Sequence, residues 1–260
     1  MGRRFSAHLG YMFTELPLEQ RFAAAARAGF ADVEHPAPFA LPAARCRQLL
    51  DDNGLRMVQI SSGSGGEGQK GLAALIGHEK AFRDDLMRAL DYAEQINCPL
   101  LHPMAGIVDP ADADRHDAVW IENIAFALQV AQGRSVDIFV EAISRHAVAG
   151  YFLHRLDQYL KLTARPDLKP QMLVDSYHAA LNGEDAAGFI RANPSRIAHV
   201  HIADLPGRHE PGTGRHDFRP LDAALAAIDY RGAIGCEYIP AGATDAGLSW
   251  RRTWPAPGDD

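Results

Sequence analysis

The sequence has 260 residues, a formal net charge of −7, and hydrophobic and charged fractions of 47% and 23%. This mildly acidic, ordinary globular composition argues against a general nucleic-acid binder or a protein of anionic membrane surfaces. The three cysteines are too few and too scattered for a disulfide framework, and no apolar run reaches the roughly 18 to 20 residues that span a bilayer. We therefore expect a cytoplasmic protein with neither nucleic-acid nor membrane partners.

Short apolar runs alternate with longer amphipathic segments along the chain. The apolar runs have the length of strands that are buried on both faces, as in a parallel sheet. They span residues 5–9, 31–34, 56–60, 99–104, 136–141, 170–175, 197–203 and 233–237. The segments between them have helical spacing of apolar residues. They span residues 18–28, 42–52, 78–95, 115–132, 151–163, 185–192 and 221–228.

Alternating strands and helices indicate βα units around a parallel sheet. Gly10 follows the first predicted strand without a G-x-G-x-x-G turn, which favours a closed barrel over an open, doubly wound sheet. We expect an α/β fold, a (β/α)8 TIM barrel formed as one domain by residues 1–260, with a loosely packed tail at 251–260. The Gly/Ser-rich stretch 61–77 would lie at the catalytic end of the barrel, either as a flexible connection or as a lid.

Four of the predicted strands carry a potential metal ligand at or near the carboxyl end. These residues are Glu141, Asp175, His201 and Glu237. A single carboxylate there is equally well explained as a helix N-cap or a surface ion pair. Four ligands on strands five to eight are harder to explain in this way, because those strand ends converge at one opening of a barrel. Three carboxylates and an imidazole suit one divalent ion, with Mn²⁺, Mg²⁺ or Co²⁺ favoured over Zn²⁺.

Further polar residues follow the same strands. His178 and His102 could each reach the opening, although each could also be an ordinary loop histidine. His199 shares the face of His201 at a deeper level, and we expect it to be a packed, hydrogen-bonded support. Asp204 could fix a loop, and Arg208 could anchor a substrate, although its cluster is equally typical of a solvated turn.

Several motifs together resemble the hydroxypyruvate isomerase family, including the 2-oxotetronate isomerases, within the xylose-isomerase-like barrels. The motifs span nearly the whole chain, and those around Arg208 and Glu237 are the most distinctive. They are Phe13-Thr14-Glu15, Arg27-Ala28-Gly29-Phe30, His102 with Met104-Ala105-Gly106, His201-Ile202-Ala203-Asp204, Arg208-His209-Glu210-Pro211-Gly212-Thr213-Gly214 and Gly235-Cys236-Glu237-Tyr238.

The resemblance implies a metal-dependent isomerase that moves a carbonyl between adjacent carbons of a small hydroxy-oxo acid through an enediolate. Glu141 and Glu237 would be metal ligands and the acid/base pair, and Asp175 a further ligand. His201 would replace the glutamine that is common at the fourth ligand position. His178 and Arg208 would contact substrate oxygens. Apart from the resemblance, we also expect His102 and His8 to contact the substrate. A small-molecule substrate is the expected partner, and the sequence leaves open whether the chain forms a homo-oligomer.

The first half of the chain departs from the family pattern. His8 stands where asparagine is usual, and Ser61 begins a segment that replaces an Asn-Pro-Gly-Asp-like loop. Gln69-Lys70 replaces an acidic residue followed by arginine. Three alternatives therefore stay open: a ketose 3-epimerase, a non-catalytic metal- or sugar-binding barrel, and a relative of endonuclease IV. The acidic charge argues against the last of these.

Overall fold

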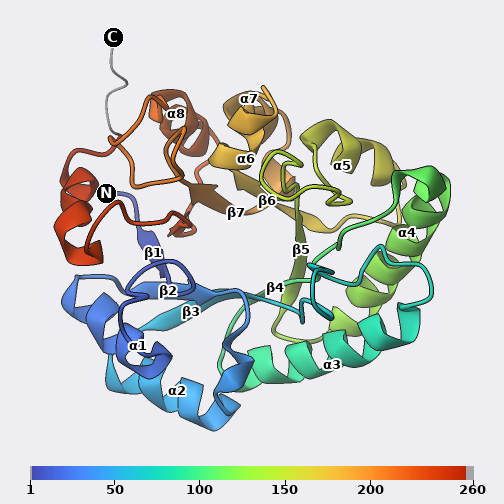
Figure 1. Cartoon of the computed structure of the whole chain (residues 1–260), viewed down its shortest axis with the longest axis horizontal. Coiled ribbons are helices and arrows are strands. Elements are labelled where there is room, and N and C mark those ends of the chain that lie inside the picture. The colour runs from blue at the N-terminus through green and yellow to red at the C-terminus, as the bar shows by residue number, and fades with distance from the viewer. Residues whose placement is uncertain (1, 256–260) are drawn as a thin grey trace.

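The structure is a computed structural model that describes residues 2–255. Eight parallel strands form a closed barrel in the order β1 to β8, and the α-helices surround it (Figure 1). The predicted TIM barrel is thereby confirmed. The strands are β1 Phe5–His8, β2 Asp32–His35, β3 Arg56–Ser61, β4 Leu100–His102, β5 Asp137–Glu141, β6 Gln171–Asp175, β7 Ile197–Ile202 and β8 Ile234–Cys236.

The helices lie between consecutive strands, as βα units require. The α-helices are α1 Leu18–Arg27, α2 Ala43–Asp52, α3 Glu79–Gln95, α4 Ala113–Ala131, α5 Leu156–Leu162, α6 Ser176–Leu181, α7 Ala186–Ala192 and α8 Arg219–Ala227. The 3-10 helices are η1 Pro38–Ala40, η2 Pro110–Asp112, η3 Pro194–Arg196 and η4 Thr244–Arg252. No helix in the described part of the chain has both the length and the apolar character of a membrane span.

Two segments differ from the sequence-based expectation. The helix predicted for 151–163 begins only at Leu156, because Tyr151 pairs with Ile107 in an isolated antiparallel bridge and ties the preceding residues into a loop. Helix α6 was not predicted, and it begins directly after β6. Asp175 forms its N-cap by accepting a 2.7 Å hydrogen bond from the N–H of Tyr177. The short helix therefore fixes the direction of the polar side chains at this strand end.

Residues 61–77 contain no long helix or strand, but the second half of the stretch is fastened to the barrel. Gly71 pairs with Ala105, and the N–H groups of Leu72 and Ala73 both donate to the carbonyl of Met104. Gly71 has a φ of 125°, and a side chain there would collide with the backbone of Met104. Glycine is therefore required where this loop crosses the loop after β4.

The end of the described chain is packed, which differs from the expectation of a loose tail from residue 251. The Arg251 guanidinium donates to the carbonyl of Ala28, and the Trp254 ring lies against Phe5. Trp254 Nε1 also donates to Asp222 Oδ1 over 2.9 Å. These contacts hold residues 251–255 on the barrel, and residues 256–260 of the predicted tail lie outside the described part.

Candidate active site

A cavity of about 310 Å³ lies over the carboxyl ends of the barrel strands, where TIM barrels hold their active sites. It is lined by residues that follow most of the strands and by the loop after β3. The lining includes His8, Tyr11, Gln59, Ser61, Ser62, Lys70, His102, Glu141, His178, His201, Arg208 and Glu237. The structure thus brings seven of the eight sequence-predicted site residues to one cavity wall, and the eighth, Asp175, contacts this group.

The three predicted carboxylate ligands lie close together, and two of them, Glu141 and Glu237, line this cavity. Glu141, Asp175 and Glu237 each offer an oxygen within 4.8 Å of the others, and a nitrogen of His178 belongs to the same group. His201 lies beside it, with Nδ1 at 3.3 Å from Glu237 Oε2. Residues nearly a hundred positions apart in the chain are therefore close enough to share one cation.

The donor atoms of this group fit a divalent cation. Glu141 Oε1, Asp175 Oδ2 and His201 Nδ1 are buried and have no hydrogen-bond partner within the described part of the chain. Buried polar atoms are normally satisfied, so unpartnered oxygens of Glu141 and Asp175 within one group of possible ligands are consistent with a site for a cation. Three carboxylate oxygens and one imidazole nitrogen are a donor set for Mn²⁺, Mg²⁺ or Co²⁺.

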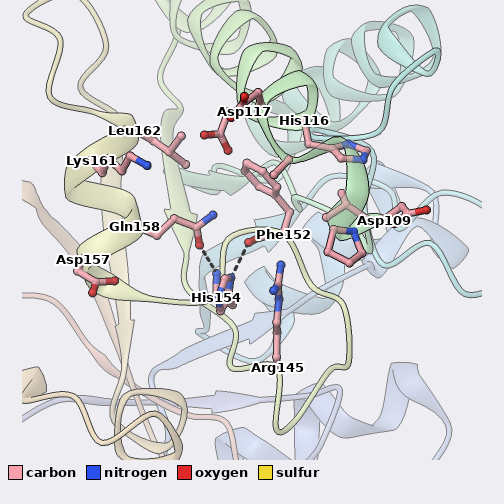
Figure 2. A pocket seen from close by; sticks show the side chains of 14 residues that line it. Asp109, His116, Asp117, Arg145, Phe152, His154, Asp157, Gln158, Lys161 and Leu162 are labelled. Carbon is pink, nitrogen blue, oxygen red and sulfur yellow. Dashed lines mark hydrogen bonds between the residues drawn. The ribbon is translucent and has the colours of Figure 1, made fainter.

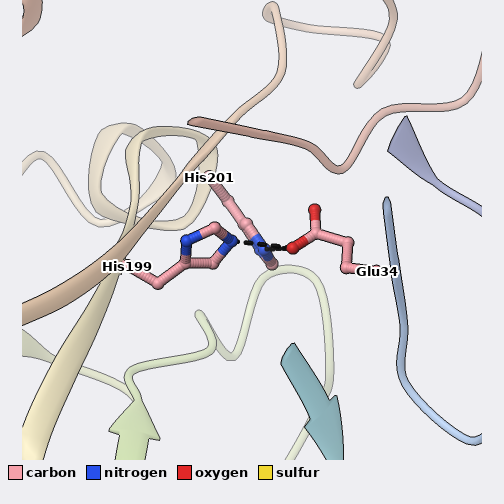
Figure 3. A group of neighbouring side chains, drawn as sticks. All are labelled: Glu34, His199 and His201. Atoms are coloured by element: carbon pink, nitrogen blue, oxygen red, sulfur yellow. Dashed lines mark hydrogen bonds and ion pairs between the residues drawn. The ribbon is translucent and has the colours of Figure 1, made fainter. Parts of the chain in front are cut away.

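His201 is oriented by a carboxylate that the sequence analysis missed. Glu34 Oε2 accepts a 2.7 Å hydrogen bond from His199 Nε2 and lies 3.3 Å from His201 Nε2 (Figure 3). Because Nε2 of His201 faces Glu34, Nδ1 is directed toward Glu237 and the carboxylate group. A side chain at Gly235 would collide with both Glu34 and His201, so that glycine gives the pair its space. The predicted role of His199 as a buried, hydrogen-bonded support is confirmed.

Arg208 places a positive charge beside the carboxylates of Glu237 and Asp175. Its Nη2 lies 2.5 Å from Glu237 Oε2 and 3.6 Å from Asp175 Oδ2. The guanidinium is also held between the rings of Tyr11 and Tyr177, at 5.0 and 5.2 Å from their centroids. Arg208 is therefore fixed at the carboxylates, where it can contact a substrate oxygen.

The remaining predicted substrate contacts lie around the same carboxylates. His8 Nε2 is 3.5 Å from Glu237 Oε1, and His102 Nδ1 is 3.8 Å from Glu141 Oε2. His178 Nε2 lies 3.7 Å from Asp175 Oδ2. Burial lowers the pKa of His102 to about 3, and burial also lowers the pKa of His8 and His178. These three imidazoles are therefore neutral and can exchange hydrogen bonds with substrate hydroxyl groups.

The pKa values of the two glutamates are shifted in opposite directions. Burial, and then the charge of Glu237, raise the pKa of Glu141 well above its ordinary value. Burial acts in the same direction on Glu237, but Arg208 and His201 outweigh it and hold the pKa of Glu237 well below its ordinary value. Burial lowers the pKa of His201, but Glu34 and Glu237 overcome this and raise it well above 6.5. Glu141 is therefore the weaker acid of the two and Glu237 the stronger.

The loop that carries Arg208 is organised by Asp204, a buried carboxylate. Its two oxygens accept four backbone N–H groups, from Leu205 and His216 on Oδ1 and from Gly212 and Gly214 on Oδ2. The distances are 2.7, 2.9, 2.8 and 3.0 Å in that order. The prediction that Asp204 fixes a loop is thereby confirmed.

Sequence reasoning missed three residues of the site, Glu34, Tyr11 and Gln59, and it noted Lys70 only as a departure from the family pattern. Glu34 carried a usable signal, because it ends the second predicted strand as Glu141 ends the fifth. Tyr11 carried none, although its position is distinctive: the charge of Glu237, and then burial, raise its pKa to about 12.

A second cavity, of about 580 Å³, lies outside the barrel between α4 and α5 (Figure 2). Acidic side chains such as Asp117 share its wall with Arg145 and Lys161, and the His154 backbone N–H is hydrogen-bonded to Gln158. None of the predicted site residues lines it. The candidate chemistry therefore belongs to the inner cavity.

Comparison with known proteins places the chain in a family. The model of the xylose isomerase-like TIM barrel family matches residues 22–254. A 2-oxo-tetronate isomerase of Cupriavidus necator is 39% identical, over 96% of this chain and 98% of that protein. The hydroxypyruvate isomerase of Escherichia coli is 31% identical, over 95% and 97% respectively. A crystal structure described as an AP endonuclease, family 2, from Brucella melitensis superimposes with a TM-score of 0.92 at 33% identity, over 97% and 99%.

These similarities extend over nearly the whole length of the chain and its relatives, so the match is not confined to the barrel scaffold. They agree with the predicted family resemblance and with the predicted enzyme class. The chain therefore belongs to the xylose isomerase-like TIM barrel family and, within it, to the hydroxypyruvate and 2-oxo-tetronate isomerases, which makes it an isomerase.

Proposed function

We propose that this isomerase moves a carbonyl group between adjacent carbons of a small hydroxy-oxo acid of the hydroxypyruvate or 2-oxotetronate kind. The observation that carries the proposal is the meeting of Glu141 and Glu237. They come from β5 and from the end of β8, and their oxygens approach within 4.8 Å at the wall of one small cavity. The names of the curated relatives support the substrate class.

Two facing carboxyl groups suit the transfer of a proton between neighbouring carbons. One carboxylate takes the proton from the carbon that carries the hydroxyl group, which leaves an enediolate, and a carboxyl group returns a proton to the former carbonyl carbon. Glu237 and Glu141 would share these roles. Arg208 and His178 would bind the two oxygens whose bond orders change, and the neutral His8 and His102 would orient the remaining hydroxyl groups.

Glu141, Asp175, Glu237 and His201 would hold one divalent cation, with His178 close enough to contribute. When bound, the cation would polarise the substrate oxygens and stabilise negative charge on them. Mn²⁺, Mg²⁺ or Co²⁺ is proposed over Zn²⁺ because the donor set is rich in oxygen.

The test is exchange of a substrate C–H proton with solvent deuterium, followed by NMR, on hydroxypyruvate and 2-oxotetronate with added Mn²⁺ or Mg²⁺. We expect exchange and isomerised product from the native chain, and a loss of at least about 1,000-fold in Glu141→Gln and Glu237→Gln. Glu122→Gln, an exposed change on α4, is the matched control and should retain full activity. Absence of exchange with both acids and both metals would reject the proposal.

The same experiment separates the alternatives. A 3-epimerase would exchange a proton and return it to the same carbon, giving a stereoisomer in place of a shifted carbonyl. A non-catalytic binder would give no exchange, and Glu141→Gln would keep its affinity for the ligand. Nicking of abasic DNA would instead support the activity in the name of the Brucella protein.

A further inference from the structure

We infer that Lys70, with Gln59 and Ser61, forms the part of the cavity that binds the carboxylate of the substrate and so selects acids over neutral ketoses. The inference deepens the proposed function and rests on it for the reaction. The evidence for the binding site itself is the charge of Lys70, the burial of Gln59 and the backbone geometry of the loop after β3.

Two cationic side chains line the cavity, and they differ in their partners. Arg208 is committed to Glu237 at 2.5 Å and to Asp175 at 3.6 Å. Lys70 has no ion-pair or hydrogen-bond partner among the residues that the structure describes. Lys70 is exposed to solvent at this wall, and its charge, which the described residues leave unpaired, is available to attract an anionic group of the ligand.

Gln59 adds an independent sign of a ligand at this wall. Its side chain lines the cavity and is 3% exposed, yet its Oε1 is buried without a hydrogen-bond partner among the described residues. Ser61 is two positions further along β3, so the two side chains project from the same face of the strand. An amide and a hydroxyl group on this face offer donors to a bound carboxylate and acceptors to a neighbouring hydroxyl group.

The backbone holds Lys70 at this position. Its φ is 55°, in the left-handed region that residues other than glycine rarely adopt. The conformation is fixed from both sides, because the carbonyl of Gln69 accepts from Ile107 and the N–H of Gly71 donates to Ser64, each over 2.8 Å. Such strain persists only where the surroundings impose it, and it is concentrated at ligand-binding sites. The loop therefore presents Lys70 to the cavity in a defined way.

The experiment compares acids with their neutral counterparts in Lys70→Met and Lys70→Arg. Turnover is measured on 2-oxotetronate and on erythrulose, a four-carbon ketose that has a hydroxymethyl group in place of the carboxylate. Binding is measured by calorimetry on the Mn²⁺-loaded chain with erythronate and with erythritol, neither of which can react. Lys169→Met is the matched control, because it removes an exposed lysine just before β6, at the opposite end of the barrel.

We expect Lys70→Met to raise KM for the acid and Kd for erythronate by about 3- to 5-fold, because Lys70 is exposed, with less than a twofold change for the neutral compounds. Lys70→Arg should retain most of the native affinity for the acid, because it keeps the positive charge. High salt should weaken binding of the acid to the native chain. Equal effects on acid and neutral ligands, or no effect, would overturn the inference. If the native chain exchanges no proton but its erythronate binding depends on Lys70, the carboxylate site stands and the proposed reaction fails.

Discussion

The hydrogen bonds of Asp204 allow a quantitative test of how the Arg208 loop is built. Asp204 is 1% exposed and accepts four backbone N–H groups from the segment that follows it. Each oxygen of Asp204 accepts two of these N–H groups. In Asp204→Asn one oxygen remains as an acceptor, and an NH2 group, which cannot accept, faces the other two N–H donors. The substitution therefore preserves shape and removes two of the four interactions together with the charge.

The expected loss follows from the strength of hydrogen bonds to charged groups, which contribute about 1.5–3 kcal/mol each. Two such bonds amount to roughly 3–6 kcal/mol, and water replaces part of this when the loop opens, which leaves about 3 kcal/mol. That free energy corresponds to about a 100-fold increase in the opening equilibrium of the loop. The stability of the barrel itself should change much less, because its strands do not depend on this loop.

Hydrogen–deuterium exchange resolved by residue is the direct assay. The amides of Gly212 and Gly214 should exchange about 100-fold faster in Asp204→Asn, while the amide of Val200 in β7 should keep its protection. Asp217→Asn is the control, since its exposed carboxylate contacts Arg219 at the surface. Unchanged protection at both glycines would refute the reasoning, as would an equal loss throughout the barrel.

Three further predictions concern the metal ligands and acid stability. Glu34→Gln should weaken Mn²⁺ binding by about 10- to 100-fold in calorimetry without unfolding the chain, because the carboxylate orients His201; an unchanged affinity would contradict this role. Mn²⁺ affinity should rise with pH above about pH 6.5, because the pKa of Glu141 and the pKa of His201 are both raised and protons must leave before a cation binds. Calorimetry in buffers of different ionisation enthalpy should show proton release, and pH-independent binding would argue against these ligands. Burial lowers the pKa of His35 to about 3, and its Nδ1 accepts the N–H of Ala37. The unfolded chain therefore binds this proton near pH 6.5 and the folded chain does not, so His35 alone should lower the free energy of unfolding by about 2 kcal/mol from pH 8 to pH 5, in addition to what other buried histidines such as His102 contribute. Urea titrations should show that the free energy of unfolding falls less between pH 8 and pH 5 in His35→Gln than in the native chain. An equal fall in both proteins would exclude His35 as the cause.

The strands and the candidate metal ligands could be predicted from the sequence because each prediction depends on local pattern. A continuous apolar run of five or six residues identifies a strand that is buried on both faces. A carboxylate at the end of such a run, as in Glu141 or Asp175, is stable only with a partner. Once the number of strands indicated a barrel, the convergence of their carboxyl ends followed from the fold. The short helix α6 escaped this reasoning because its capping residue is the predicted ligand Asp175 itself.

What only the tertiary structure decided is which distant residues meet. Glu34 lies between two histidines that are 165 and 167 positions later in the chain, because closure of the barrel brings β2 across the interior from β7. Lys70 reaches the cavity because Gly71 passes against the backbone of Met104 and fixes the course of the loop. The pattern of the sequence predicts which residues are buried and which polar residues stand at strand ends. The distances among their side chains depend on strand register, barrel closure and the path of loops, which are properties of the folded chain as a whole.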